Sequence, residues 1–213
     1  MMRFRQAKEN ITATLGDAAD GRFTVIGYQR QVPGRPEKPD AEQRLVQVFY
    51  QRSQFPQSAS PMRGPIQHRA TYALELSVYT AARGNVTELL EAAETDEDRK
   101  AALETFKEAA DLADEALDEL FDVVFQILMD ARNFSFGFTD KPRVVGDRWI
   151  TELSKDDPVP HGAHVLLTGR STLELSIVED IEGAETVAGD LIALDILTQE
   201  EENARAGVKV AAE

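Results

Sequence analysis

The sequence contains no cysteine, so it forms no disulfide and offers no thiolate for catalysis. It also lacks a long apolar run, because the longest candidate, residues 121–129, is interrupted by Asp122 and Gln126. That stretch is too short to span a bilayer. The first residues, MMRFRQAKENITATLG, lack the apolar centre of a signal peptide. These absences predict a soluble protein that is made in a cytoplasm and has no membrane partner.

Basic residues are scarce, since 23 lysines and arginines face 38 acidic residues and the net charge is −15. Because Lys and Arg supply most of the affinity for nucleic-acid phosphates, this balance disfavours a protein that grips DNA or RNA. An acidic surface is still compatible with DNA that passes by without being held, since like charges repel. The apolar fraction of 42% excludes general disorder, and 213 residues are enough for one domain with a substantial core.

Recognisable catalytic motifs are also missing. The sequence has no glycine-rich phosphate loop, no His-Glu-x-x-His and no nucleophile elbow. Two of its three histidines, His161 and His164, lie close together beside Asp156 and Asp157, which makes them a candidate metal site. Their spacing matches no established ligand pattern, so we favour a polar turn that contains histidines. We therefore predict no catalytic residue, no bound metal and no cofactor.

One long amphipathic helix is expected over residues 95–132, because its apolar residues recur at helical spacing and form one stripe. Glu115, Glu119 and Asp122 share another face of this helix, at positions i, i+4 and i+7. Carboxylates in such an arrangement hold Mg²⁺ in all-α nucleotide pyrophosphohydrolases. The same spacing is typical of a solvated acidic face, which is the interpretation that we favour because strands flank the helix.

Alternation of apolar and polar residues predicts strands before and after this helix. The clearest run is 68–81, where the apolar side consists of Tyr72, Leu74, Leu76 and Val78. Asn85 and Glu88 form a partial capping box for a short helix. Further strands are expected at residues 22–28, 44–50, 143–154 and 163–179, a turn at 155–161, and shorter helices at 4–19 and 86–93.

The order of these elements predicts an α+β fold, with a mixed, mainly antiparallel sheet, helices packed on one face, and extended loops. In this interpretation residues 1–180 form a single domain. Residues 181–213 form a C-terminal extension that is partly ordered. Its apolar part, residues 185–197, is compatible with either a strand or a helix.

Two irregular stretches flank the strand expected at 44–50. Residues 29–40 contain three prolines, and residues 51–67 contain three prolines and three serines, so neither stretch is expected to join a ladder of hydrogen bonds. The plain alternative is a pair of solvated loops. Their length and basic residues favour arms that dock on an acidic neighbour or on a second copy of the chain. The residues proposed for this contact are Arg30, Arg35, Lys38, Arg52, Phe55 and Arg63.

Three phenylalanines alternate in the segment FSFGF at 134–138. In an extended segment, Phe134, Phe136 and Phe138 would lie on one side. Such an aromatic side either packs into the core or meets another subunit. We therefore add Phe134 and Phe136 to the candidate interface residues.

The order of elements resembles the tail terminator and tail completion proteins of long-tailed bacteriophages. The resemblance lies in the opening helix, the strand RLVQVFY, the irregular QFPQSASPMRGPIQ and the strand HRATYALELSVYTA, and it continues through RWITELS and STLELSIVED. It covers about residues 2–180 and is one of pattern rather than of a diagnostic motif. The chain departs from the smaller members of that family in its proline-rich stretch at 31–39 and in its extension after Glu179.

The resemblance implies a homo-oligomer, a hexameric ring that caps the tail tube and meets the head-completion proteins of the neck. It carries over no catalytic residue. DNA would pass through the lumen without specific binding, and the protein would reside in the virion after assembly in the host cytoplasm. A closed ring requires one patch to meet a different patch on the next copy. The alternatives are another neck connector or tube-like protein, or a metal-dependent hydrolase that uses the acidic helix.

Overall fold

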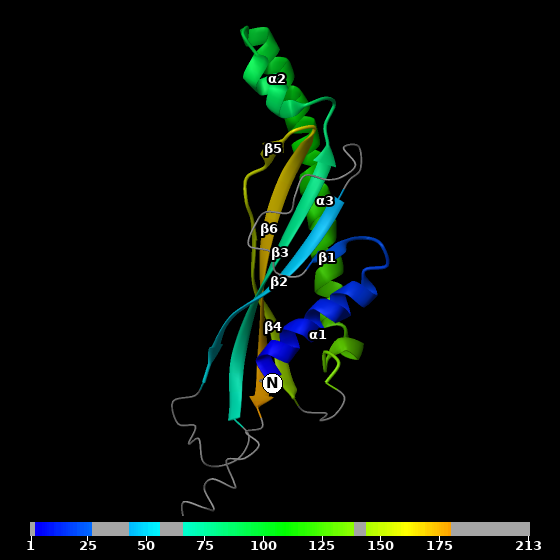
Figure 1. The fold of residues 1–213 in the computed structure, drawn as a ribbon, viewed down its shortest axis with the longest axis vertical. Coiled ribbons are helices and arrows are strands. Elements are labelled where there is room, and N and C mark those ends of the chain that lie inside the picture. The colour runs from blue at the N-terminus through cyan, green and yellow to red at the C-terminus, as the bar shows by residue number, and fades with distance from the viewer. Residues whose placement is uncertain (1–2, 27–42, 56–65, 139–143, 180–213) are drawn as a thin grey trace, which may run out of the picture.

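The computed structural model describes residues 3–26, 43–55, 66–138 and 144–179 of the chain (Figure 1). These residues form an α+β fold, as predicted. The helices are α1 (Arg3–Ala18), α2 (Val86–Ala92) and α3 (Asp96–Met129). The strands are β1 (Thr24–Ile26), β2 (Gln43–Gln54), β3 (Ile66–Ala81), β4 (Val145–Lys155), β5 (Val159–His161) and β6 (His164–Glu179). The stretch at 29–40 and the extension at 181–213 lie outside the described residues.

The sheet has the strand order β1-β2-β3-β6-β4, with β5 paired to β6. Strand β1 runs parallel to β2, whereas the other described pairs are antiparallel. The centre of the sheet is the pairing of β3 with β6, which runs from Ile66 opposite Glu179 to Ala81 opposite His164. These two sixteen-residue strands are separated in the sequence by α2, α3, β4 and β5, so the sheet depends on contacts between distant parts of the sequence.

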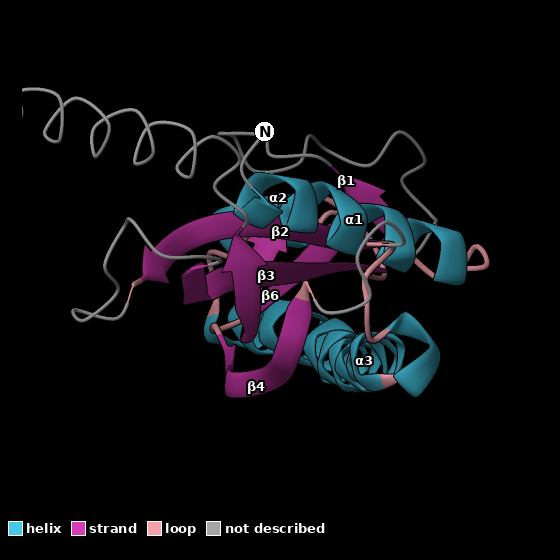
Figure 2. Ribbon diagram, turned by 90° about the horizontal axis from the view of Figure 1, so that it is seen from below, coloured by secondary structure: helices cyan, strands magenta, loops and turns pink. Residues whose placement is uncertain are grey.

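Both long helices cover the same face of the sheet (Figure 2). Helix α1 presents Ala7, Ile11 and Leu15 to the sheet, which is the spacing that its sequence predicts. Asp20 and Gly21, both at positive φ, end this helix and turn the chain into β1. At its other end, the Glu179 carboxylate accepts hydrogen bonds from the backbone N–H groups of Arg3 and Phe4, at 2.9 and 3.1 Å. The last residue of β6 thus satisfies the first amides of α1.

Helix α3 begins at a full capping box. The Thr95 hydroxyl accepts from the Asp98 N–H at 3.1 Å, and the Asp98 carboxylate accepts from the Thr95 N–H at 3.4 Å. Its 34 residues span about 51 Å, close to the ~53 Å of the sixteen-residue central strands. The helix is offset along the sheet, so α2 and the first turns of α3 project past the sheet's end (Figure 1). No helix in the described part of the chain is both long and apolar enough to cross a membrane.

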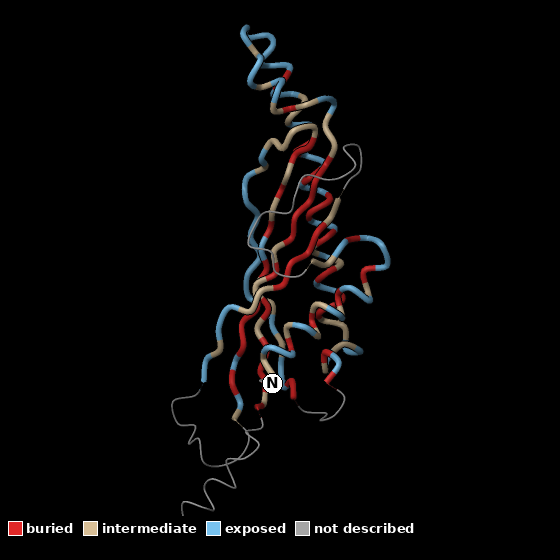
Figure 3. Tube along the Cα trace, viewed as in Figure 1, coloured by how far each residue is buried: buried red, intermediate tan, exposed pale blue. Residues whose placement is uncertain are grey.

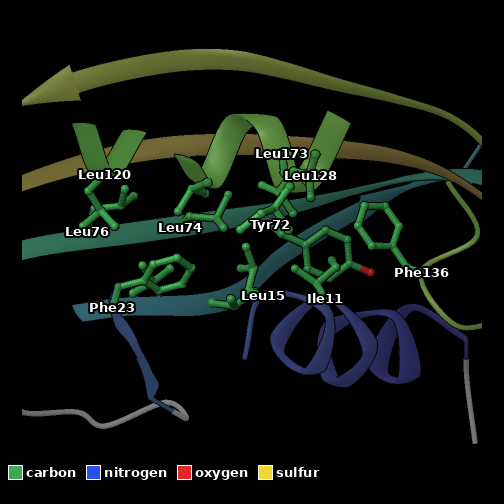
Figure 4. Close-up of a cluster of buried hydrophobic side chains, with 14 of the residues drawn as sticks. Ile11, Leu15, Phe23, Tyr72, Leu74, Leu76, Leu120, Leu128, Phe136 and Leu173 are labelled. Carbon is green, nitrogen blue, oxygen red and sulfur yellow. The ribbon is translucent and has the colours of Figure 1, made fainter. Parts of the chain in front are cut away.

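The core lies between the helices and the covered face of the sheet. Burial follows the central strands and the inner sides of the helices, whereas the projecting helical end is largely exposed (Figure 3). In Figure 4, Ile11 and Leu15 of α1 lie across from Tyr72 of β3. The fully buried side chains in this view are Ile11, Leu15, Tyr72, Leu74, Leu76, Leu128, Phe136 and Leu173. The apolar side predicted for the strand at 68–81 is therefore confirmed as the core-facing side.

Three local predictions were wrong. The irregular stretch expected at 51–67 is shorter, because β2 continues to Gln54 and β3 already begins at Ile66. The turn expected at 155–161 contains the short strand β5. The segment 134–138 is not extended: a 3₁₀ turn at Ala131–Asn133 leads into turns, and Phe136 has a φ of 44°. Its phenylalanines therefore do not share one side.

Candidate assembly surface

Strand β4 forms one border of the sheet and carries exposed apolar groups. Among the described strands it pairs with β6 alone, so its other side is an open edge. Its pairing register shifts between Val145 and Arg148, beside Gly146, and again between Ile150 and Glu152. Such an edge offers backbone groups and side chains to another chain.

On the helix-covered face, an apolar groove lies between α3 and β4. We call it the Phe125 groove, and its volume is about 270 Å³. Its walls include Phe121 and Phe125 of α3 and Ile150 and Leu153 of β4. Phe125 is 47% exposed and Leu153 is 59% exposed. Burying these two side chains against a partner would be favourable, because each removes apolar surface from water.

On the other face of the sheet, an open hollow of about 630 Å³ lies beside β4. We call it the Trp149 hollow. Trp149, the only tryptophan of the chain, is 38% exposed on this face. Phe55, 48% exposed, borders the hollow at the strand end, but its ring stacks on His68 on the helix-covered face. The Arg69 guanidinium lies 5.0 Å from the centre of the Trp149 ring and 3.4 Å from a Glu174 carboxylate oxygen. The hollow therefore combines one exposed aromatic ring with charges of both signs.

Buried contacts, most of them on the helix-covered face, hold the strand ends next to this hollow. Phe55 stacks on His68 with ring centres 4.6 Å apart. The His68 ring is buried, and its Nε2 lies 3.2 Å from the Glu179 carboxylate that caps α1. Gln67 donates to the Ser176 hydroxyl at 2.6 Å. Because these side chains are tied to β3, β6 and α1, the aromatic surface is preorganised for contact.

The predicted interface residues have different locations. Arg30, Arg35, Lys38 and Arg63 lie outside the described residues. Arg52 is exposed on β2, next to the register shift after Tyr50, and Phe55 borders the Trp149 hollow. The structure thus places Phe55, but not Arg52, beside this hollow.

The two phenylalanines of the candidate set separate. Phe134 is 41% exposed, and the Arg148 guanidinium lies 5.4 Å from its ring centre. Phe136 is fully buried in the main core. Its assignment as an interface residue was wrong, because the turn at positive φ directs this ring into the core instead of along an extended face.

Arg148 joins β4 to the end of α3. Its Nη2 donates to the backbone carbonyls of Met129 and Asp130 at 2.8 and 2.7 Å, so it satisfies carbonyls at the helix C-terminus. The Asp130 side chain accepts from the Arg132 guanidinium and the Arg132 backbone N–H, and these hydrogen bonds lower the pKa of Asp130 to about 2. Both arginines thus fix the turn that follows α3.

The acidic residues of α3 make ion pairs with two strands of the sheet, β2 and β4. Glu119 accepts from Arg44 of β2 at 2.9 Å. On the opposite flank, Lys155 of β4 lies 2.6 Å from Asp114 and 2.8 Å from Asp118. Glu115 and Asp122 are exposed. The acidic face is therefore partly used to hold α3 on the sheet, and Arg44 already neutralises one of the three carboxylates considered for Mg²⁺.

The candidate metal histidines lie opposite each other in the pairing of β5 with β6. His161 lies 5.5 Å from Tyr79, measured between ring centres, and His164 is fully buried. Within the described ranges, no three His, Cys, Asp or Glu side chains are grouped so as to hold a metal ion.

The residues that sequence reasoning missed are Arg69, Phe125, Trp149 and Leu153. Phe121 and Phe125 are four residues apart and lie beside the buried stripe of α3, which was the available signal for the groove. Trp149 gave no periodic signal, because bulges interrupt the alternation of β4.

No protein-family model matches the chain, and no curated protein matches it significantly.

Proposed function

We propose that this chain is a structural subunit that assembles head to tail into a ring and caps the tail tube of a long-tailed phage. The observation that carries the proposal is the open edge at β4, which has the Phe125 groove on one face and the Trp149 hollow on the other. Exposed apolar and aromatic side chains on both sides of one edge are typical of an interaction surface. The resemblance in element order directs this proposal to the tail terminator family.

The opposite border of the sheet presents different groups from those at β4, and a head-to-tail contact requires two unlike surfaces. There the described part of β1 has three residues and pairs with β2, and the proline-rich stretch follows it in the sequence. A ring forms when two unlike patches meet and the rotation between copies closes. The net charge of −15 would favour a lumen that repels DNA enough to let it slide.

The proposed function is tested by adding the purified chain to tail tubes and imaging the tube ends by electron microscopy. We expect rings at one end of each tube. Leu153→Glu should keep the fold, since this side chain is 59% exposed, but it should abolish capping by placing a charge in the Phe125 groove.

Leu103→Glu is the matched control, because Leu103 is 55% exposed on the projecting part of α3 and lies away from β4. It should cap tubes like the parent. Bare tube ends with the parent chain would contradict the proposal. Loss of capping in both variants would contradict an interface at the Phe125 groove.

A further inference from the structure

We infer that the Phe125 groove receives Met62 and Arg63 from the loop between β2 and β3 of a neighbouring copy. The inference rests on the proposed head-to-tail assembly and names the segment that fills one of its surfaces. The groove is built from described residues of α3, β4 and β6. Its proposed occupant belongs to residues 56–65, which lie outside the described part of the chain.

The groove is apolar inside and acidic at its border. Its volume is about 270 Å³, and its apolar walls include the exposed side chains of Phe125 and Leu153. Asp122 borders it and is also exposed. A partner that brings an apolar side chain next to a cation would bury the first against Phe125 and pair the second with Asp122.

Asp122 is the carboxylate that this border leaves open. Nearer the start of α3, Asp114 and Asp118 share the Lys155 ammonium, at 2.6 and 2.8 Å. Asp122 makes no ion pair among the contacts of the described residues. A cation of the partner is therefore the charge that this end of the groove lacks.

The loop at 56–65 offers such a combination in its neighbours Met62 and Arg63. Methionine is unbranched and flexible, so it fills irregular apolar gaps. The arginine stem can lie along apolar surface while its guanidinium reaches a carboxylate. Ser60 and Pro61 favour a type I turn, which would present Met62 near its tip. Proline also restricts the free loop, which lowers the entropy lost on binding.

The other long stretches outside the described residues match the groove less well. Residues 29–40 contain one apolar side chain besides proline, the short and branched Val32. Residues 185–197 are rich in apolar side chains, but Asp190 and Asp195 lie among them. Their charges would be repelled by an acidic border. The combination of a long apolar side chain and a cation thus favours the loop at 56–65.

A chain cannot place Met62 in its own groove. Met62 lies four residues before Ile66, where β3 begins, so a fully extended chain carries it at most about 14 Å. The groove residue of the sheet nearest to that end is Ile150, which pairs with Leu173, the partner of Tyr72. Tyr72 is about 20 Å along β3 from Ile66, and Ile150 lies two strands, or about 10 Å, to the side. The receptor must therefore belong to another copy.

The topology gives this contact a direction. The loop joins the ends of β2 and β3, whereas the groove lies on the flank that α3 and β4 form. Loop and groove are thus different patches, and their contact is heterologous, as a ring requires. A crosslink between them should join a loop to a groove and never one loop to another.

The test exploits the absence of native cysteine. Met62→Cys and Leu153→Cys are introduced into separate full-length chains, which are mixed and treated with a short bis-maleimide crosslinker. We expect a covalent heterodimer on a denaturing gel from the mixture and no covalent dimer from either variant alone. A chain that carries both changes should form a ladder that ends at the size of the ring.

Other positions for the cysteine control for specificity. Leu103→Cys lies on the projecting part of α3 and should give no product with Met62→Cys. Equal product with Leu103→Cys and Leu153→Cys would overturn the inference. So would product with Leu153→Cys from Val32→Cys or Leu194→Cys but not from Met62→Cys, since it would give the groove to another stretch of the chain.

A charge exchange tests the ion pair. Arg63→Asp in the Met62→Cys chain, or Asp122→Arg in the Leu153→Cys chain, should each abolish the heterodimer, and both together should restore it. Glu115→Arg replaces Asp122→Arg in the matched control, because Glu115 is exposed on α3 but does not border the groove. It should not restore the product. Equal rescue by both arginines would overturn the pairing of Arg63 with Asp122.

The same samples separate this inference from the proposed function. If the heterodimer forms but the parent caps no tail tubes, the tail function fails alone. If the parent caps tubes but the mixture gives no heterodimer, even on capped tubes, the assignment of the loop to the groove fails alone.

Discussion

Gly169 of β6 determines how closely α3 approaches the sheet. A Cβ atom at this position would lie 2.5 Å from Cζ of Phe121 and 3.2 Å from Cδ2 of Leu117. The Phe121 ring is only partly buried and can move, but Leu117 is fully buried. A side chain at 169 would therefore push the helix outwards.

Gly169→Ala should lower the free energy of unfolding by about 1–3 kcal/mol, since overpacking forces neighbouring side chains from their positions. Urea unfolding measures this change. Combining it with Phe121→Leu should restore part of the loss, because the two sites are in contact. Gly16→Ala is the control: nothing lies within 4 Å of its Cβ position, and it should stabilise α1 by roughly 0.4–1 kcal/mol. Equal effects at both glycines would contradict the close approach.

Asp130 provides a prediction about pH. Hydrogen bonds from the Arg132 side chain and backbone lower the pKa of Asp130 to about 2. The unfolded chain has the ordinary carboxyl pKa of about 3.9. Because the folded pKa is the lower one, the stability from this pair is present above pH ~4 and is lost as the pH falls towards ~2.

Carbon-13 NMR of the Asp130 carboxyl group measures this pKa directly. Arg132→Gln should move the midpoint up towards about 3.9, since it removes the charged donor. Arg83→Gln, in the turn after β3, should leave the midpoint in place. A midpoint near 4 in the parent would contradict the hydrogen-bond geometry.

Among the described elements, α3 is the longest. Its buried side chains recur along one stripe and join the residues of β3 and β6 in the main core. Outside this stripe, its carboxylates pair with Arg44 and Lys155. These pairs are exposed and contribute little to stability, so the apolar stripe holds the helix in place.

Leu117→Asp should unfold the protein or reduce its free energy of unfolding by several kcal/mol, because the side chain is fully buried and an unpaired charge there is strongly unfavourable. Leu112→Asp is the matched control on the same helix, since Leu112 is 55% exposed. It should change stability by less than about 0.5 kcal/mol. Thermal unfolding followed by circular dichroism compares them, and a Leu117 variant with the parent's melting temperature would contradict this packing.

For the whole molecule, fold and assembly are expected to depend on different residues. Deleting residues 33–39 leaves nine of the sixteen residues that join Ile26 to Gln43. Nine residues still bridge the gap, because Ile26 lies opposite Gln47, about 13 Å along β2 from Gln43. The deletion should therefore keep the melting temperature of the parent.

The same deletion should prevent assembly on tail tubes, since it removes most of the proline-rich, basic stretch that is predicted to dock on a neighbouring copy. Tube capping and the yield of infectious particles measure this effect. A second deletion, of residues 57–63, tests the other predicted loop, which joins Phe55 to Ile66. Normal particles after the first deletion would show that the segment at 33–39 is only solvated surface.

Local sequence patterns determined the elements and the fold class. Alternation located β3 and β6, the spacing of apolar residues located α1 and α3, and Asn85 with Glu88 marked the start of α2. These signals are local because backbone hydrogen bonds and side-chain periodicity act within a few residues. Patterns in the segments between elements were less informative. The segment FSFGF alternates like a strand, but its backbone turns at Phe136, which leaves Phe134 exposed and Phe136 buried.

The surface beside β4 was decided only by the tertiary structure. Arg69 and Trp149 are far apart in the sequence, and they meet because β3, β6 and β4 pair side by side in the sheet. Likewise, the exposure of Leu153 and Phe125 depends on where α3 crosses the edge of the sheet. Burial is a property of neighbours across the fold, and a sequence pattern specifies which side of an element is apolar but not what covers it.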